Sequence, residues 1–446
     1  MRWIQRMAFY QRLTAMLLCL NLIGSARAEV ANTPEAGIAA GARKRLTLAA
    51  AKRMALARNW DLLAARSEVD LATAQRIIAR EFPNPTLTVS SSKINVDDRP
   101  NSTPAGNGIW DRSYDSVIAI NQLFEVGGKR TSRQVSALAG FKTAEARFND
   151  ARRLLDLAVT KAYIDALLAE ADVQILNQSA ATLRQEAGMA ETRLEAGDIS
   201  LADKSQIEIT ARRMELGAKA AEAAASAARI ALEVLMGSSD PKDDWAPGDT
   251  LQQLAELPPS AAQVEPGASR PDLIAARAAL QKSEADLKLQ RAFRIPDPTF
   301  LVQFEHEPPD QPNTIGIGVS LPLPLWNRNK GGISAARAAQ DQALVQLRKV
   351  QAQIAGEIQA ARIVYAGAAE RWRRHREEIE PKSAEIRKTV SFAYEKGGAS
   401  LLDLLSAERN DNDVRLATAQ AAAETATAAV TLNSALNRED PETNPK

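Results

Sequence analysis

Cysteine and histidine are almost absent from this chain of 446 residues, which has one cysteine and two histidines. Cys19 lies near the N-terminus, and His306 and His375 are far apart in the sequence. A single cysteine excludes an intrachain disulfide, and this set is too small for a zinc-type site of clustered Cys and His ligands. We therefore interpret both histidines as solvated side chains, and we expect no cofactor and no metal ligand set.

Long apolar runs are missing after the N-terminal segment, so no later stretch predicts a transmembrane helix. The sequence also has no phosphate-binding loop, no nucleophile motif and no clustered carboxylate–histidine set. Without such groups the sequence offers no chemistry for covalent or acid–base catalysis. We therefore do not expect an enzyme.

Residues 1–28 have the features of a secretory signal peptide: basic residues flank an apolar stretch at 13–23 that is too short to span a bilayer. Ala26 and Ala28 supply the small residues of a cleavage site, and the leucine before Cys19 argues against a lipoprotein signal. Removing this segment leaves 52 basic and 55 acidic residues, a net charge of −3 that argues against nucleic acid as a partner. The sequence therefore predicts an exported protein.

A short turn segment occurs twice, at 194–203 and at 394–403, with identities at the Glu, the first Gly, the Ser, the first Leu and the Asp. Glycine lets the backbone turn at low cost, and Ser followed three residues later by an acid restarts a helix as in a capping box. The residues concerned are Gly197, Ser200 and Asp203 in the first copy and Gly397, Gly398, Ser400 and Asp403 in the second. Each copy predicts a helix that turns sharply and returns.

Helical periodicity surrounds these turns. The predicted helical segments are 46–80, a copy that begins at 272, the long segments 128–196 and 329–396, and the return segments 200–236 and 400–436. Each long segment would extend about 100 Å as a helix, far more than the width of a globular domain. For the helices alone, this pattern favours a plain antiparallel coiled coil.

Four short segments alternate with period two, at 86–90, 116–122, 300–304 and 314–321. In the last of them the aliphatic side chains share one face, and glycine and serine share the other. This is typical of a membrane barrel strand, although a strand of a soluble sandwich has the same local pattern. Four strands cannot close a barrel, so we expect them to pair with other copies of the chain or to form a small soluble sheet.

The expected organisation is a signal peptide at 1–28, a first repeat at 29–236, a linker at 237–268 with little regular structure, a second repeat at 269–437 and a tail at 438–446. The helices and strands are joined by distinctive segments at 121–130 and 320–331, which contain Gly127, Gly128, Pro322, Pro324 and Trp326. With the duplicated turn, these segments resemble the TolC-like outer membrane factor family. They look closest to its heavy-metal branch, of the cobalt–zinc–cadmium type, and the resemblance covers residues 46–437.

The resemblance implies a mainly α fold with a small β part, made of two structural repeats that each run helix, β-hairpin, long helix, turn, helix. It implies a homotrimer whose strands form a twelve-stranded β-barrel in outer-membrane lipid, continuous with a periplasmic α-helical barrel. The protein would be located in the cell outer membrane with a large periplasmic portion. Its partners would be a periplasmic adaptor and an inner-membrane proton-driven pump.

The function implied is a passive, gated exit channel of a tripartite resistance-nodulation-division efflux system, for divalent cations of the cobalt, zinc, cadmium or nickel type. Two alternatives remain open. One is the same channel serving drug efflux or type I protein secretion. The other is a periplasmic coiled-coil adaptor or structural protein without a barrel.

The resemblance also places the two turns at the periplasmic tip. Asp203 and Asp403 are then candidates for acidic rings in the pore, although each also has the spacing of a capping residue. Arg193 and Tyr394 are candidates for closing contacts or are simple helix surface, and we expect the second turn to be the main gate. Trp326, Trp110 and Tyr114 are candidate interfacial aromatic anchors, and Trp326 alternatively packs at the neck of the barrel.

Overall fold

The computed structural model describes residues 43–92, 115–257, 269–307 and 311–438. The folded unit is Lys44–Lys446. The expected signal peptide, with Ala26, Ala28 and Cys19, lies outside the described residues, as do Trp110 and Tyr114. Among the described ranges, no helix combines the length and apolarity needed to cross a membrane.

The first half of the folded unit contains β1 (Lys44–Leu46), α2 (Leu48–Arg58), α3 (Trp60–Ile78), β2 (Thr86–Ser92), β3 (Asp115–Leu123), α4 (Lys129–Glu195) and α5 (Leu201–Leu235). The second half contains β4 (Trp245–Pro247), α6 (Leu251–Glu256), α7 (Pro271–Ala292), β5 (Thr299–Glu307), β6 (Gln311–Ser320), α8 (Lys330–Arg374), a π-helix (His375–Ile379), α9 (Glu380–Glu395) and α10 (Leu401–Ala435). The predicted mainly helical fold with a small sheet is confirmed.

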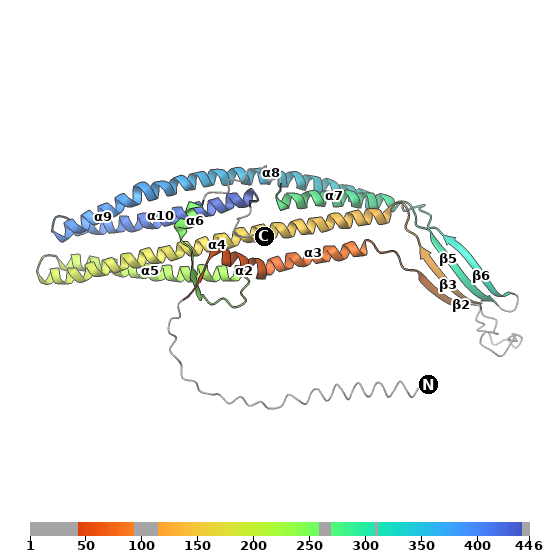
Figure 1. The fold of residues 1–446 in the computed structure, drawn as a ribbon, viewed down its shortest axis with the longest axis horizontal. Helices are drawn as coiled ribbons and strands as arrows, with labels where there is room; N and C mark the ends of the chain where they lie inside the picture. The colour runs from red at the N-terminus through yellow and green to blue at the C-terminus, as the bar shows by residue number, and fades with distance from the viewer. Residues whose placement is uncertain (1–42, 93–114, 258–268, 308–310, 439–446) are drawn as a thin grey trace, which may run out of the picture. The chain divides into compact units, whose positions relative to one another are not determined.

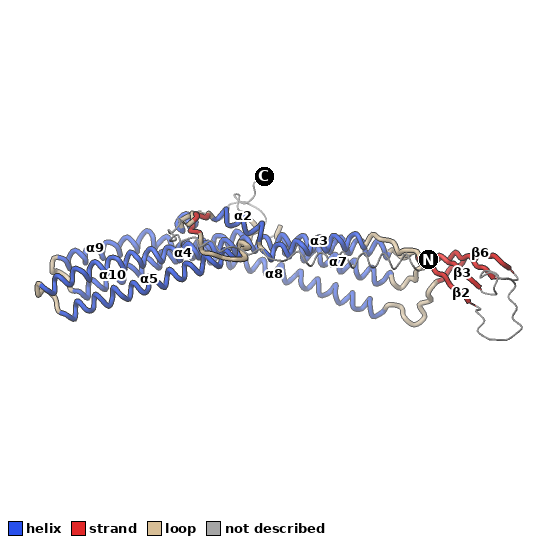
Figure 2. Tube along the Cα trace, turned by 90° about the horizontal axis from the view of Figure 1, so that it is seen from below, coloured by secondary structure: helices blue, strands red, loops and turns tan. Residues whose placement is uncertain are grey.

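Strands β2, β3, β5 and β6 lie at one end of the helices and the two turns lie at the other, as both views show (Figures 1 and 2). These four strands form an antiparallel sheet in the order β2-β3-β5-β6. Each predicted hairpin is present, and the two hairpins join where β3 pairs with β5. Within the described residues the outer strands β2 and β6 therefore each have a neighbour on one side only.

The prediction of a single helix over 46–80 is wrong, because the helix is interrupted at Asn59, which separates α2 from α3. Asn59 is extended, its side-chain oxygen accepts a hydrogen bond from the Leu62 N–H at 3.1 Å, and its amide donates to the Leu235 carbonyl at 3.0 Å. Asparagine can replace the helical hydrogen bonds of its own backbone in this way. It therefore ends one helix and begins the next.

The long second helix predicted over 329–396 is interrupted by the π-helix His375–Ile379. Pro381 follows in the first turn of α9, has no backbone N–H and would clash with the carbonyl four residues before it. The backbone widens instead, so that the Glu380 N–H bonds to the carbonyl of His375, five residues back. The helical direction continues through this turn, as Figure 1 shows.

The linker has more regular structure than the sequence predicts. It contains β4 and α6, and β4 pairs in parallel with β1, with Lys44 opposite Trp245. A three-residue strand has too little pattern to be found in a sequence, and its partner lies about 200 residues away. The prediction of little regular structure at 237–268 is therefore wrong for these two elements.

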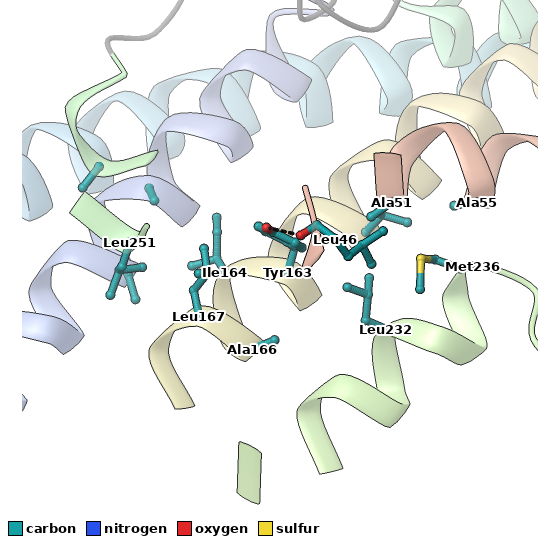
Figure 3. Packing of buried hydrophobic residues seen from close by; sticks show 14 of the residues in the cluster. Leu46, Ala51, Ala55, Tyr163, Ile164, Ala166, Leu167, Leu232, Met236 and Leu251 are labelled. Atoms are coloured by element: carbon teal, nitrogen blue, oxygen red, sulfur yellow. Dashed lines mark hydrogen bonds between the residues drawn. The ribbon is translucent and has the colours of Figure 1, made fainter. Parts of the chain in front are cut away.

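The main hydrophobic core lies where the linker meets α2, α4 and α5 (Figure 3). Tyr163 is fully buried there and stacks on Trp245 with ring centres 6.3 Å apart. Its hydroxyl lies 2.8 Å from the carbonyl oxygen of Leu46 and 2.7 Å from an Asp249 carboxylate oxygen. One side chain of the first repeat therefore contacts the small β1–β4 sheet where both of its strands end.

Candidate functional site at the helical turns

The two helical turns have the same backbone geometry. Gly197 and Gly397 have φ angles of +77° and +76°. In each turn the N–H of the next residue bonds to a carbonyl five residues back, at 2.9 Å for Asp198 and 2.7 Å for Gly398. These bonds satisfy carbonyls that the helix end leaves without partners, and the left-handed conformation favours glycine.

Both returning helices begin with a capping box. The Asp203 N–H donates to the Ser200 hydroxyl at 3.1 Å, and the Ser200 N–H donates back to the Asp203 carboxylate. The same two contacts recur in the second copy, where the Asp403 N–H donates to the Ser400 hydroxyl at 3.2 Å. The hydrogen bonds that Asp403 accepts from the Ser400 hydroxyl and N–H lower its pKa below the usual 3.8. Its carboxylate is exposed and ionised near neutral pH. The structure therefore shows the capping role for both acids, and a pore role stays a prediction.

Two of the other predicted residues contact each other across the hairpins. The Arg193 guanidinium carbon lies 4.8 Å from the centre of the Tyr394 ring, which is 7% exposed. Burial raises the pKa of Tyr394, and the charges of Glu186 and Asp203 raise it further, while Arg193 lowers it. Arg193, Tyr394 and Asp203 thus lie close together at the end of α4.

More polar contacts join the first hairpin to the second, along what we call the inter-hairpin seam: the face of α4 at 178–193 and the parts of α9 and α10 that it contacts. The Ser179 hydroxyl donates to the Asn412 side-chain oxygen at 2.9 Å, and Arg415 donates to Gln178 at 2.7 Å. Sequence reasoning missed the seam, because polar residues on a helix normally indicate a solvated face.

The seam also contains buried acids. Glu186 on α4 and Glu408 on α10 are each 8% exposed, and burial is the largest cause of the raised pKa of each. Arg387 on α9 lies 3.5 Å from Glu408 and 3.0 Å from Asp411. The charge of Glu408 further raises the pKa of Glu186, so the charge of an acid on α10 acts on an acid of α4 across the seam.

The predicted junction residues lie far from the turns, between the sheet and the helices (Figure 1). Gly127 and Gly128 have φ angles of +72° and +73°, and a Cβ on Gly127 would come within 2.9 Å of the Ile295 side chain. Lys129 then pairs with Asp297 at 2.7 Å. In the second junction Pro322, Pro324 and Trp326 are exposed.

The sheet has one apolar, exposed face. In register across it lie Ile120, Val302 and Ile317, which are 54%, 55% and 85% exposed. The opposite face carries small or polar residues, such as Ala119, Gln303 and Gly316 in the neighbouring row. A sheet with two such faces can separate an apolar phase from an aqueous one.

The two histidines are not brought together. His306 lies within hydrogen-bonding distance of Asn313 at 3.2 Å in the sheet, and His375 begins the π-helix. Within the described residues, no group of three or more His, Cys, Asp or Glu side chains is arranged to hold a metal ion.

Comparison with known proteins gives a consistent result over both repeats. The family model of the outer membrane efflux protein matches residues 51–238 and 267–438. The cobalt-zinc-cadmium resistance protein CzcC of Cupriavidus metallidurans is 26% identical, over 88% of this chain and 90% of that protein. The nickel and cobalt resistance protein CnrC of the same organism is 24% identical, over 68% of this chain and 70% of that protein.

Among solved structures, the CmeC outer membrane channel of Campylobacter jejuni has the same fold with a TM-score of 0.74. The similarity covers 87% of this chain and 85% of that chain at 18% sequence identity. At this identity the comparison concerns the fold alone.

Proposed function

Because this chain belongs to the outer membrane efflux protein family, we propose that it is the outer membrane channel of a tripartite system that exports divalent metal cations. The observation that carries the proposal is the similarity to CzcC, a cobalt-zinc-cadmium resistance protein, over nearly the full length of both proteins. The similarity to CnrC, a nickel and cobalt resistance protein, supports the same substrate class. The chain acts as a passive channel rather than as an enzyme.

The sheet supports a homotrimer in the outer membrane. Its edge strands β2 and β6 each have an open side within the described residues. Unpaired strand edges are not stable in a bilayer, and three copies joined edge to edge give a closed twelve-stranded barrel. In that barrel the face with Ile317 and Val302 contacts outer-membrane lipid, and the face with Gln303 and Gly316 lines the channel.

The helical end supports a gate. Tyr394 lies in the last turn of α9, just before the second hairpin reverses, and Arg193 of the first hairpin contacts its ring. Releasing this contact would let the second turn move away from the first, so we assign the second turn as the main gate. The docking partner that releases it is a periplasmic adaptor protein, and an inner-membrane proton-driven pump supplies the energy.

The acids of the turns support a preference for cations. In a trimer, Asp203 and Asp403 each occur three times, and rings of carboxylates attract cations and repel anions. The capping contacts use one carboxylate oxygen, Oδ2, in both residues. A capping carboxylate therefore keeps its negative charge at the turn, and the capping and pore roles are compatible.

The proposal is tested by deleting the gene in its host and exposing the cells to cobalt, zinc, cadmium and nickel salts. Increased sensitivity to these metals, restored by the intact gene, is expected. Sensitivity to drugs with unchanged metal tolerance would instead favour a drug efflux channel. The location is tested separately: a heat-modifiable trimer in outer-membrane fractions is expected, and a soluble periplasmic monomer would contradict the proposal.

A further inference from the structure

Two glutamates on different hairpins meet in the inter-hairpin seam. Glu186 lies on α4 and Glu408 on α10, and both side chains are 8% exposed. The hydrogen bond of 2.9 Å between Ser179 and Asn412 joins the same two helices. Glu186 lies two helical turns from Ser179 along α4, and Glu408 lies one turn from Asn412 along α10, so each glutamate shares a helix face with a residue of this contact.

The charged groups around the pair do not fully neutralise it. Those that act on Glu186 are Glu408, Glu395 and Arg193, and those that act on Glu408 are Arg387, Asp411 and Arg415. Arg193 is also engaged by the Tyr394 ring, and Arg415 by Gln178. The surrounding cations are therefore shared with other partners.

Arg387 is shared in the same way. It lies nearer to Asp411, at 3.0 Å, than to Glu408, at 3.5 Å. Asp411 is 4% exposed, and its Oδ1 is buried without a hydrogen-bond partner. Glu380 lies close enough to Asp411, Arg415 and His375 to sense their charges, and burial raises its pKa. The described part of the seam thus holds five carboxyl groups with three arginines and one histidine.

A buried carboxyl beside a like charge is more stable when protonated. The pKa values of Glu186 and Glu408 are both raised from the usual 4.5, and burial is the largest cause in each case. Glu408 and Glu395 raise the pKa of Glu186 further. Arg387 lowers the pKa of Glu408, and Asp411 raises it. If the hairpins separate, water reaches both groups and their pKa values return toward 4.5. The closed seam therefore binds protons that the open seam releases.

The sign of the effect follows from this difference. Below pH 4.5 both groups are protonated in the closed and the open seam, so the pair adds no penalty to closure. As the pH rises from 4.5 through the raised pKa, the closed seam loses stability relative to the open one. Above the raised pKa the destabilisation of the closed seam is complete.

We propose that Glu186 and Glu408 form a proton-operated latch between the two helical hairpins, which holds the gate closed while the pair carries a proton and weakens when both groups ionise. The latch rests on the proposed function, because it regulates the gate of the channel. It lies on the sides of the hairpins rather than at the turns, and it acts independently of the acids that cap the returning helices.

The test uses the full-length protein in planar bilayers, with open probability measured across the pH range 4 to 8. The native chain is expected to open more often as the pH rises, by about tenfold for each unit by which the closed-state pKa is raised. The double variant Glu186→Gln/Glu408→Gln cannot ionise and is expected to stay closed across the range. An unchanged pH profile in the double variant would overturn the latch.

Matched variants separate the latch from general loss of charge. Glu222→Gln/Glu385→Gln removes the same charge from exposed positions on α5 and α9 and is expected to keep the native pH profile. The single variant Glu408→Gln removes one of the like charges that raise the pKa of Glu186, so its step is expected at lower pH. Asp403, whose pKa is lowered, titrates below 3.8 and does not overlap with this step.

Hydrogen exchange provides a readout that needs no channel activity. At pH 7, the backbone amides at 179–190 and 404–415 are expected to exchange more slowly in the double variant than in the native chain, because the neutral seam stays closed. Equal or faster exchange in the double variant would contradict the latch. Failure of the native chain to form channels would contradict the proposed function alone, and the exchange rates would still decide the latch.

Discussion

The guanidinium carbon of Arg193 lies 4.8 Å from the centre of the Tyr394 ring, which joins the last turn of α4 to the last turn of α9. The contact is one turn of helix away from Gly197 and Gly397, where the two hairpins reverse. A cation over a largely buried aromatic ring contributes about 1 to 2 kcal/mol. This contact therefore holds the two hairpins together at the end where we propose the gate.

Arg193→Ala is expected to raise the open probability of the channel without its adaptor by about 5- to 30-fold, the factor that corresponds to 1 to 2 kcal/mol. Tyr394→Ala is expected to have a similar effect, because it removes the ring. Tyr394→Phe keeps the ring and is expected to stay close to the native value. Single-channel recording of the three variants measures the effect, and a native open probability in Arg193→Ala would show that the contact is only helix surface.

The capping and pore roles of Asp403 can be separated by two substitutions. Asp403→Asn removes the charge and keeps a side-chain oxygen that accepts the capping hydrogen bonds, whereas Ser400→Ala removes the cap and keeps the charge. If the acid lines the pore, Asp403→Asn lowers the selectivity for cations over anions, and Ser400→Ala does not. The reversal potential in a salt gradient measures this, and equal selectivity in Asp403→Asn and the native channel would leave the capping role alone.

The pH dependence of this selectivity has a definite sign. The Ser400 hydrogen bonds favour the ionised carboxylate and lower the pKa of Asp403 below 3.8. If Asp403 lines the pore, its contribution to cation selectivity is therefore expected to be fully present near neutral pH and to be lost only as the pH falls below 3.8. Ser400→Ala removes the hydroxyl bond and keeps the backbone N–H bond, so the loss is expected at a higher pH than in the native channel.

Local features of the fold could be predicted from the sequence because their causes are local. Gly197 and Gly397 mark the turns, and the Ser and Asp that follow restart the helices. The alternation at 314–321 identified β6 for the same reason. In each case the residues that determine the structure lie within a few positions of one another.

Features that depend on distant partners were missed. Asn59 looks like one polar residue in a helix until the Leu235 carbonyl is placed beside it. The burial of Glu186 and Glu408 depends on the register of two helices more than 200 residues apart, which no spacing in the sequence encodes. The π-helix could be predicted only in part. Pro381 predicts that the helix is perturbed near this position, but it does not predict whether the helix ends there or widens by one residue.

Tyr163 is expected to be a major determinant of stability where the linker meets α4. Its hydroxyl contacts the Leu46 carbonyl and Asp249, and burial together with the Asp249 carboxylate raises its pKa, so it stays protonated at all ordinary pH values. Tyr163→Phe removes the hydroxyl from both acceptors, although the Leu46 carbonyl keeps the Gly248 N–H and the Asp249 carboxylate keeps the Leu48 N–H. Because one of the lost contacts is to a charged group, we expect the fold to be destabilised by about 1 to 3 kcal/mol.

The measurement is the thermal unfolding of the helices, followed by circular dichroism. Tyr365→Phe is the matched control, because Tyr365 packs against the second core cluster on α8 and is only partly buried. It is expected to have the smaller effect. A Tyr163→Phe variant as stable as the native chain would show that the hydroxyl contributes no net stability.

The assignment of the two faces of the sheet predicts opposite outcomes for the same substitution. Ile317 is 85% exposed on the apolar face, and Gln303 lies on the other face, paired with Gly316. Ile317→Arg places a charge against the lipid and is expected to destabilise the barrel by about 2 to 4 kcal/mol at the middle of the bilayer. Gln303→Arg places the same charge toward water and is expected to be tolerated.

The heat-modifiable trimer in outer-membrane fractions is the readout for both variants. We expect a clear loss of this trimer for Ile317→Arg, and near-native amounts with altered conductance for Gln303→Arg, because the added charge would lie in the channel. If both variants assembled equally well, the apolar face would not contact lipid. Failure of Gln303→Arg alone would mean that the two faces are reversed, because only a lipid-facing position excludes an arginine so strongly.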